Sequence, residues 1–263
     1  MSFTCVSIER NYKVSTIWLN RPDVRNAFNE VMIAEITDAF MQEGQREDVR
    51  AIVLRGKGKV FCAGADLNWM RDVAQYGYEQ NYTESLQLSE CFHTIYKCPK
   101  PTLAIVHGAA MGGGNGLFAA CDFAFCEAET IFSLSEVKIG IIPACISPYI
   151  IKRVGEYGAR DLMLTGQRIN GATAEQYKLV NKSFKDIHET EAHLQATIQL
   201  LLSSGPAAMA HCKKLIDTVC NQISMTEAIH FTAKMIAEIR SSQEGQEGMT
   251  SFLEKRKPNW IEK

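Results

Sequence analysis

The sequence predicts an α/β core followed by a helical C-terminal part. Up to about residue 147, short runs rich in β-branched and aromatic residues alternate with stretches whose apolar residues recur at helical spacing. From Pro148 onward the helical spacing dominates. No Pro/Ser-rich linker, low-complexity tract or fixed-period repeat interrupts the sequence, so we expect one packed unit with its core over 1–200 and its helical region over 201–263.

The strands of the core are predicted from short apolar runs that end in turn residues. Val14–Leu19 has the β-branched and aromatic content of a strand and stops at Asn20-Arg-Pro22. A helix is predicted from Asn29, and another around 88–95 ends before Pro99. Further strands are expected at 51–54, 102–106, 123–126 and 131–133.

The C-terminal part is expected to be a series of helices. Pro206 suits the first position of a helix, and Ser224 with Glu227 has the S-x-x-E form of a capping box. The predicted helices cover 159–164, 172–177, 189–202, 206–219, 224–240 and 244–253.

Composition and charge exclude several classes of protein. With 46% hydrophobic and 22% charged residues over 263 positions, the chain is neither disordered nor fibrous. A formal charge of −2 argues against nucleic-acid binding and against binding to an anionic membrane. No apolar run reaches the ~18 residues of a membrane span, and the start resembles neither a signal nor a transit peptide. We therefore expect a soluble, cytoplasmic chain.

The cysteines and histidines point to neither a disulfide framework nor a metal site. The nine cysteines are odd in number and include no C-x-x-C pair, so reduced, packed cysteines are expected. The six histidines contain no H-x-x-x-H or H-x-H spacing. No metal is predicted.

Two glycine-bearing turns, 62–66 and 112–116, each lead into the apparent start of a helix. They do not match a dinucleotide fingerprint, and the chain has neither a phosphate loop nor a G-x-S-x-G nucleophile elbow. Helix N-termini present unpaired backbone N–H groups, and small residues let a ligand approach them. Two such groups could converge on one carbonyl oxygen and stabilise its developing charge, although glycines that serve only tight turns would look the same.

Four blocks of sequence resemble the crotonase family, also called the enoyl-CoA hydratase/isomerase superfamily. They occur in the family's order and spacing, and Leu164–Arg168 and Phe252–Pro258 are also similar to it. The resemblance covers essentially the whole chain. The blocks are 19–27 (LNRPDVRNA), 61–66 (FCAGAD), 107–114 (HGAAMGGG) with Cys121-Asp122, and 132–143 (FSLSEVKIGIIP).

The resemblance implies a spiral of repeated ββα units with a helical C-terminal trimerisation region, assembled as a trimer or a dimer of trimers. It implies an acyl-CoA thioester as substrate and no separate cofactor, since coenzyme A enters with the substrate. The backbone N–H groups of Ala65 and Gly113 match the family's oxyanion hole. The positions that match coenzyme A contacts are Val24, Arg25, Ala27, Ala65, Asp66, Leu67, Asn68, Phe252 and Lys255.

The resemblance also assigns a catalytic carboxylate. Family hydratases commonly use two glutamates, and here only Glu136 is present, because Gly116 stands at the other position. Between Phe132 and the apolar run 139–142, Glu136 is better placed than the chain's other glutamates for partial burial, which would raise its pKa toward the range useful for proton transfer.

Stretches 64–70 (GADLNWM) and 142–150 (IPACISPYI) resemble the branch of methylglutaconyl-CoA hydratases of leucine degradation. This similarity implies hydration of a short, branched 2-enoyl-CoA, with 3-methylglutaconyl-CoA as the first choice. Trp69, Gly116 and Ala144 are expected to line the acyl pocket, with Gly116 leaving room for the branched group or a water. Lys138 or Arg153 could pair with a distal substrate carboxylate, but a solvated side chain is the better interpretation of each.

Three other functions stay open. A Δ3,Δ2-enoyl-CoA isomerase would use Glu136 alone, and a decarboxylase of a carboxylated acyl-CoA would use the same oxyanion hole. A non-catalytic protein that binds RNA or a partner is disfavoured by the near-neutral charge and by the retained Glu136.

Overall fold

The computed structural model describes residues 3–261 and contains a six-stranded sheet as its central layer. The strand order is β1-β2-β3-β4-β6-β9, and only the β1–β2 pair is antiparallel. The strands of the middle of the sheet are nearly continuous apolar runs, as expected of a sheet covered on both faces. Their bounds are β1 Val6–Asn11, β2 Val14–Leu19, β3 Ala51–Gly56, β4 Thr102–Val106, β6 Phe123–Glu127 and β9 Lys182–Phe184.

A second, three-stranded sheet carries the segments that matter for function. It consists of β5 Ala109–Met111, β7 Ile131–Ser133 and β8 Arg168–Asn170, with β7 in the middle. Successive ββα turns run β4-β5-α4 and then β6-β7-α5, so that β4 pairs with β6 and β5 pairs with β7. This stacking of repeated ββα units agrees with the predicted fold.

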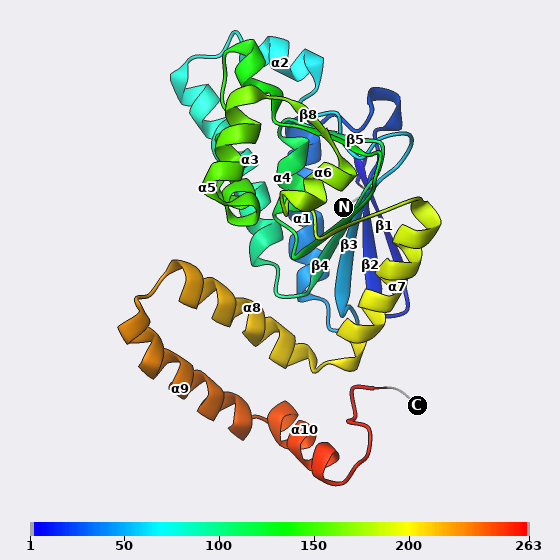
Figure 1. The fold of residues 1–263 in the computed structure, drawn as a ribbon, viewed down its shortest axis with the longest axis vertical. Helices are drawn as coiled ribbons and strands as arrows, with labels where there is room; N and C mark the ends of the chain where they lie inside the picture. The colour runs from blue at the N-terminus through cyan, green and yellow to red at the C-terminus, as the bar shows by residue number, and fades with distance from the viewer. Residues whose placement is uncertain (1–2, 262–263) are drawn as a thin grey trace.

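Helices cover both faces of the large sheet. Helices α1 Glu30–Gln45 and α3 Tyr78–Lys97 pack against each other, while α7 Ile187–Ser203 covers the opposite face near β3, β6 and β9 (Figure 1). The main core lies on the side of α1 and α3 and includes Phe40, Phe92 and Phe118. The remaining helices of this part are η1 Pro22–Val24, α2 Leu67–Val73, α4 Gly114–Ala119, η2 Ser135–Ile139, α5 Ser147–Thr165 and α6 Gly171–Gln176.

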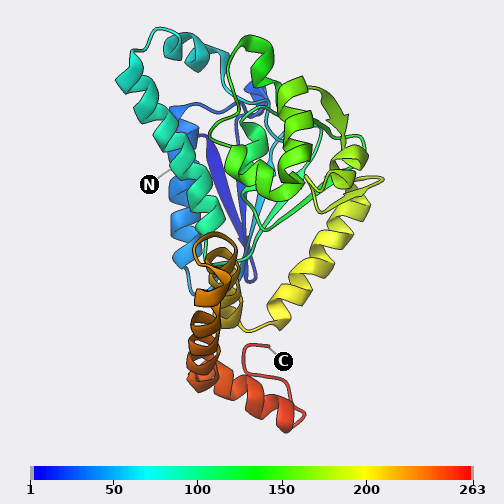
Figure 2. The ribbon, with the colours of Figure 1, turned by 60° about the vertical axis from the view of Figure 1, so that its left-hand side comes forward.

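The C-terminal region extends away from the core. It comprises α8 Pro206–Asn221, α9 Met225–Ser241 and α10 Gln243–Leu253, and Figures 1 and 2 show it below the core, at the opposite end of the molecule from α2. Pro206 begins α8, and the predicted capping box of Ser224 and Glu227 is formed. Since α7 continues to Ser203, the helical extension begins at Pro206, a few residues after the predicted 201.

Most core elements lie where the sequence predicts them, and the differences have physical reasons. Strands β5, β8 and β9 have three residues each, too few for a periodic pattern to show. Helix α2 begins directly after the turn 62–66, where the sequence predicts the start of a helix, but its extent was not predicted, because it buries no residue and has no apolar stripe. Nine cysteines are free, and six of them are buried.

Candidate active site

The two glycine-bearing turns lie side by side. The Cys62 N–H donates to the Ala109 carbonyl at 3.1 Å, and the Met111 N–H donates to the Cys62 carbonyl at 3.0 Å. Gly114 faces Cys62 so closely that a β-carbon at position 114 would lie 2.9 Å from Cys62 Sγ. The short β-bridge between Cys62 and Ala110 therefore places the turn 62–66 against the turn 111–114.

Both turns present backbone N–H groups that make no hydrogen bond with any residue of 3–261, and these include that of Ala65 on the first turn and that of Gly113 on the second. Phe28 supports both. Its N–H donates to the Gly64 carbonyl and its carbonyl accepts from the Asp66 N–H, both at 2.9 Å. Its ring lies against Gly113, where a β-carbon would come within 2.6 Å of Phe28 Cζ. Two donors on neighbouring turns, held by one residue, are the arrangement that stabilises an oxyanion.

Glu136 lies in η2, just after β7, and packs against the second turn. A β-carbon at Gly112 would lie 3.3 Å from Glu136 Oε1, so the glycine allows the carboxylate to rest against the backbone. Glu136 Oε2 is buried and has no hydrogen-bond partner among the described residues. Burial raises the pKa of Glu136 above its ordinary value of 4.5. An unpaired buried carboxylate is costly to stability and is the type of group found at acid/base sites.

The structure corrects the expectation that Gly116 leaves room for substrate or water. Gly116 is buried in α4, and a β-carbon there would lie 2.4 Å from Ile146 Cγ2 and 2.7 Å from Phe92 Cζ. These two side chains already fill the space where the family's other glutamate would project. The position is closed to any side chain, which leaves Glu136 without a second carboxylate at this point.

The loop 21–28 packs along the first turn and holds Val24, Arg25 and Ala27, which match coenzyme A contacts by resemblance. The Ala63 N–H donates to the Arg25 carbonyl at 3.0 Å, and the Ala27 N–H donates to the Val24 carbonyl at 3.1 Å. Ala27 is buried, whereas the side chains of Val24 and Arg25 are exposed. Arg25 adopts a left-handed backbone conformation with φ 56°, which turns the chain back toward Ala27.

Asp66 anchors the first turn rather than pointing freely into solution. Its carboxylate caps α2 by accepting from the Asn68 N–H at 2.9 Å, and it pairs with Arg21 Nη2 at 2.9 Å. Burial alone would raise the pKa of Asp66, but the Asn68 N–H and the Arg21 guanidinium lower it below the usual value. Sequence reasoning missed Arg21, although it lies inside the recognised block 19–27.

The remaining residues of the first turn and the proposed acyl pocket have different environments. Leu67 and Asn68 are exposed at the start of α2. Trp69 is half-buried, its ring centroid is 5.7 Å from that of Phe28, and its Nε1–H donates to Glu84 at 2.9 Å. Ala144 is exposed between η2 and α5, where its carbonyl accepts from the Ser147 hydroxyl.

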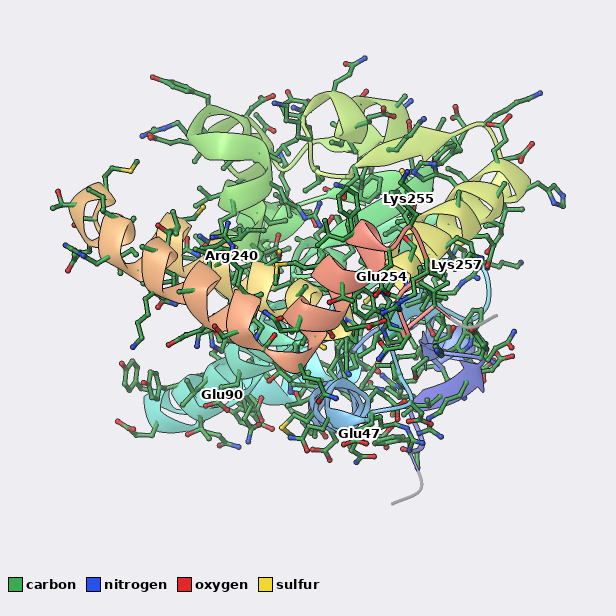
Figure 3. The ribbon with its side chains drawn as sticks, turned by 90° about the horizontal axis from the view of Figure 1, so that it is seen from below. Glu47, Glu90, Arg240, Glu254, Lys255 and Lys257 are labelled. Carbon is green, nitrogen blue, oxygen red and sulfur yellow. The ribbon has the colours of Figure 1, made fainter. Side chains whose placement is uncertain are left out.

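Within one chain the structure does not bring Phe252 and Lys255 to the two turns. Phe252 lies in α10 and is exposed, and Lys255 follows α10. Figure 3, which looks at the molecule from below, shows Lys255 at the end of α10, whereas Figures 1 and 2 place α2 at the opposite end.

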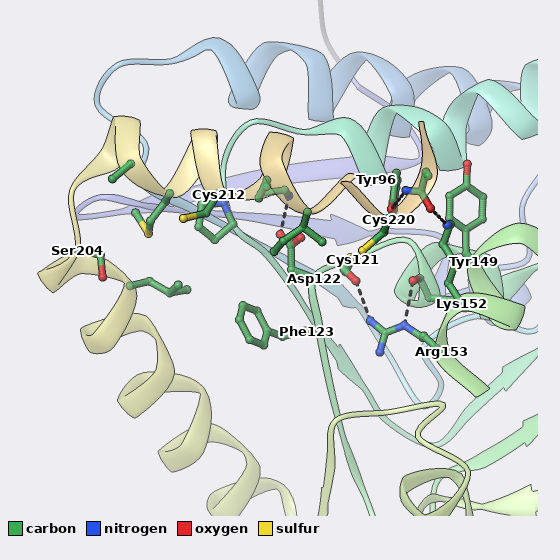
Figure 4. A pocket seen from close by; sticks show the side chains of 18 residues that line it. Tyr96, Cys121, Asp122, Phe123, Tyr149, Lys152, Arg153, Ser204, Cys212 and Cys220 are labelled. Atoms are coloured by element: carbon green, nitrogen blue, oxygen red, sulfur yellow. Dashed lines mark hydrogen bonds and ion pairs between the residues drawn. The ribbon is translucent and has the colours of Figure 1, made fainter. Parts of the chain in front are cut away.

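Neither basic residue considered for a distal substrate carboxylate faces Glu136. The Arg153 guanidinium donates to the carbonyls of Ala119 at 2.9 Å and Cys121 at 2.7 Å and so caps the C-terminus of α4 (Figure 4). The Lys138 side chain is exposed and passes over Gly166, where an added β-carbon would lie 3.2 Å from Lys138 Cε.

A cavity of about 720 Å³ lies between α8 and the core, away from the two turns (Figure 4). Lys213 of α8 pairs with Asp122 of the core at 2.6 Å at its margin. None of Ala65, Gly113 and Glu136 lines this cavity.

Within residues 3–261, no helix is both long and apolar enough to cross a membrane.

Comparison with known proteins agrees with this geometry. A model of the enoyl-CoA hydratase/isomerase family matches residues 9–263. A Thermus thermophilus relative whose name includes enoyl-CoA hydratase is 34% identical over 255 residues, which are 97% of this chain and 100% of that one. The crystal structure of an enoyl-CoA hydratase from Shewanella pealeana is similar with a TM-score of 0.94 and 38% identity, over 98% of this chain and 96% of that chain. Pseudomonas aeruginosa AtuE has a TM-score of 0.94 and 33% identity, over 98% of this chain and 100% of that chain. The chain therefore belongs to the enoyl-CoA hydratase/isomerase family, the crotonase superfamily.

Proposed function

We propose that the protein hydrates a 2-enoyl-CoA thioester, with Glu136 as the acid/base and the N–H groups of Ala65 and Gly113 as the oxyanion hole. The observation that carries this proposal is the position of Glu136. Its Oε2 is buried and has no hydrogen-bond partner among the described residues, and its Oε1 would lie 3.3 Å from a β-carbon at Gly112, the residue before Gly113. The two N–H groups would stabilise the charge that develops on the thioester oxygen, and the nearby Glu136 would transfer the proton.

In the proposed reaction, ionised Glu136 takes a proton from water while the water oxygen forms a bond to the β-carbon. The electron pair of the double bond moves to the α-carbon and the thioester oxygen, whose negative charge the two N–H groups stabilise. Protonated Glu136 then gives its proton to the α-carbon, which collapses the enolate and completes the addition of one water. One carboxylate suffices because it returns the proton that it removed.

The substrate we propose is a short, branched 2-enoyl-CoA, with 3-methylglutaconyl-CoA as the first choice. Two stretches of this chain, 64–70 and 142–150, resemble the methylglutaconyl-CoA hydratase branch. Trp69 lies against Phe28, which supports the oxyanion turn, and Ile146 fills the space beside Gly116. Both stretches thus touch residues that surround the reacting groups.

A Δ3,Δ2-enoyl-CoA isomerase is the second candidate. It is favoured by the packing at Gly116, where Ile146 and Phe92 exclude another carboxylate. An isomerase needs only one base to carry a proton between two carbons, and it needs no ordered water. The two functions therefore differ in whether water is incorporated.

Coenzyme A would bind along the loop 21–28 and the start of α2, through Val24, Arg25, Ala27, Asp66, Leu67 and Asn68. The exposed side chains of Val24, Arg25, Leu67 and Asn68 lie on these two adjoining segments. A trimer or a dimer of trimers would cover apolar side chains that the C-terminal helices expose in a single chain. These exposed side chains are Ile216, Met225, Ile229, Ile236, Met249, Phe252 and Leu253.

An assay at the absorbance of the enoyl thioester separates the candidates. The purified protein is incubated in turn with 3-methylglutaconyl-CoA, crotonyl-CoA and 3-hexenoyl-CoA. A branched-chain hydratase causes loss of signal with the first substrate and little with the second. A gain of signal from 3-hexenoyl-CoA, with no hydration of the other two, would instead identify an isomerase. Activity that persists unchanged in Glu136→Gln would show that the acid/base assignment is wrong.

A further inference from the structure

Asn115 is a fully buried side chain that connects the two halves of the proposed site. It is the second residue of α4, and its Nδ2 donates to the Gly112 carbonyl at 2.8 Å and to the Ser133 carbonyl at 3.0 Å. Its Oδ1 accepts no hydrogen bond from residues 3–261. The orientation of the amide follows from its partners, because the reverse orientation would place Oδ1 against two carbonyl oxygens.

The two carbonyls that Asn115 binds belong to different parts of the reaction machinery. Gly112 precedes Gly113, whose N–H is the proposed donor, and a β-carbon added at Gly112 would lie 3.3 Å from Glu136 Oε1. Ser133 ends β7, three residues before Glu136. The Gly112 N–H also donates to the Ser133 carbonyl at 2.8 Å. Gly112, Ser133 and Asn115 are therefore linked to one another by three hydrogen bonds, which join the turn to the strand.

We infer that Asn115 is a positioning residue that sets the oxyanion turn relative to Glu136. This inference rests on the proposed function, in which the Gly113 N–H and Glu136 act on the same thioester. The Asn115 amide bonds to both backbones and reinforces the link that the Gly112–Ser133 hydrogen bond makes between them, which helps to fix the distance between the donor and the base. Displacement by about 1 Å of either group costs up to about 100-fold in rate.

We expect Asn115 to contribute little to the stability of the fold. A substitution of Asn115 should therefore test its effect on the geometry of the site without unfolding the protein. The Gly112 carbonyl also accepts from the Asn115 backbone N–H at 2.9 Å, and the Ser133 carbonyl keeps the Gly112 N–H. Neither carbonyl loses its last partner when the amide is removed. A leucine of similar shape would also remove the unpaired Oδ1, and such replacements of buried polar groups by apolar ones are close to neutral.

The test compares Asn115→Leu with Asn170→Leu in the full chain. Asn170 is a matched control, because its side chain also bonds to the backbone of a helix start, accepting from the Thr173 N–H at 3.0 Å, but it touches neither turn. We expect both variants to lower Tm by less than about 4 °C. Asn115→Leu should reduce kcat at least about 10-fold with KM changed less than about 3-fold, whereas Asn170→Leu should retain both.

Hydrogen exchange gives a readout that does not depend on turnover. In Asn115→Leu, amides of 109–118 and of 131–141 should both exchange faster than in the unchanged protein and in Asn170→Leu. Unchanged exchange in either segment would overturn the inference, as would an unchanged kcat in an active enzyme. If the unchanged protein turns over no acyl-CoA, the proposed function fails, and the exchange result alone then decides whether Asn115 holds the two segments together.

Discussion

The ring of Phe28 lies against the α-carbon of Gly113, so closely that a β-carbon at position 113 would come within 2.6 Å of Cζ. The backbone of Phe28 meanwhile bonds to Gly64 and Asp66 on the other turn. Phe28 therefore contacts both of the turns that carry the two candidate oxyanion donors.

Gly113→Ala should impair catalysis through this contact. The added methyl group must displace either the Phe28 ring or the turn that carries Gly113. Either displacement changes the position of the Gly113 N–H relative to the thioester oxygen. We expect kcat to fall by about 100-fold, the usual cost of losing one oxyanion donor. Steady-state kinetics with the enoyl-CoA substrate measures the loss.

Gly77→Ala is the matched control for that substitution. No atom lies within 4 Å of a β-carbon at position 77, and the backbone φ of −72° suits alanine. It should leave kcat unchanged. The double variant Gly113→Ala/Phe28→Leu should recover part of the activity, and full activity in Gly113→Ala alone would contradict the assignment of this donor.

Glu136→Gln should abolish most turnover while leaving the binding of the acyl-CoA intact. The amide occupies the same space against Gly112 but cannot accept a proton from water, so kcat should fall by about 10²–10⁴-fold. Rapid kinetics and titration with a saturated acyl-CoA distinguish the two effects. Loss of binding together with turnover would point to a structural role for Glu136 instead.

The pH dependence of activity should reflect the burial of Glu136. The carboxylate acts first as a base and must be ionised, and burial raises its pKa above 4.5. The acidic limb of kcat/KM should therefore lie above pH 4.5 and rise with pH. A raised pKa in the folded state favours folding at low pH, and this contribution is lost as pH rises through the folded pKa. Hence the Tm of Glu136→Gln should exceed that of the unchanged protein at pH 8, and the difference should shrink toward pH 4.

Gly116→Ala should destabilise the fold because Ile146 and Phe92 already occupy the space. Overpacking of this kind costs about 1–3 kcal/mol. In Ile146→Ala the methyl group at 2.4 Å is gone, so the same glycine replacement should cost less there. Urea unfolding of the four proteins in this cycle measures the coupling. Strictly additive effects would show that Ile146 does not close the position.

Asp66→Asn should weaken the first turn by removing the partner of Arg21. Each is largely buried, with 8% and 20% of their side chains exposed, and loss of a charged hydrogen bond costs about 1.5–3 kcal/mol. The lowered pKa of Asp66 means that its stabilisation is present above the ordinary pKa of 3.8 and is lost as pH falls through the lower folded value. The difference in unfolding free energy between the two proteins should therefore be full at pH 7 and vanish in strong acid. A constant difference across this range would exclude the ion pair as the cause.

The local structure of this protein follows largely from its sequence. Val14–Leu19 and Ile131–Ser133 are strands with the predicted bounds, Asn29 caps α1, and Ser224 caps α9 with Glu227. These features depend on residues a few positions apart, whose propensities and hydrogen bonds act within one element. The glycine-bearing turns are local in the same sense, whereas the isoleucines of 139–142, expected to bury Glu136, are exposed.

The assembly of the site depends on contacts between distant parts of the chain. The Cys62–Ala110 bridge, the Phe28 ring on Gly113 and the Asn115 bonds to Gly112 and Ser133 come from tertiary packing. The same packing closes Gly116, where the sequence alone suggested open space. A periodic pattern shows which face of an element is buried, but the atoms that meet across that face are decided by how all the elements fill the core together.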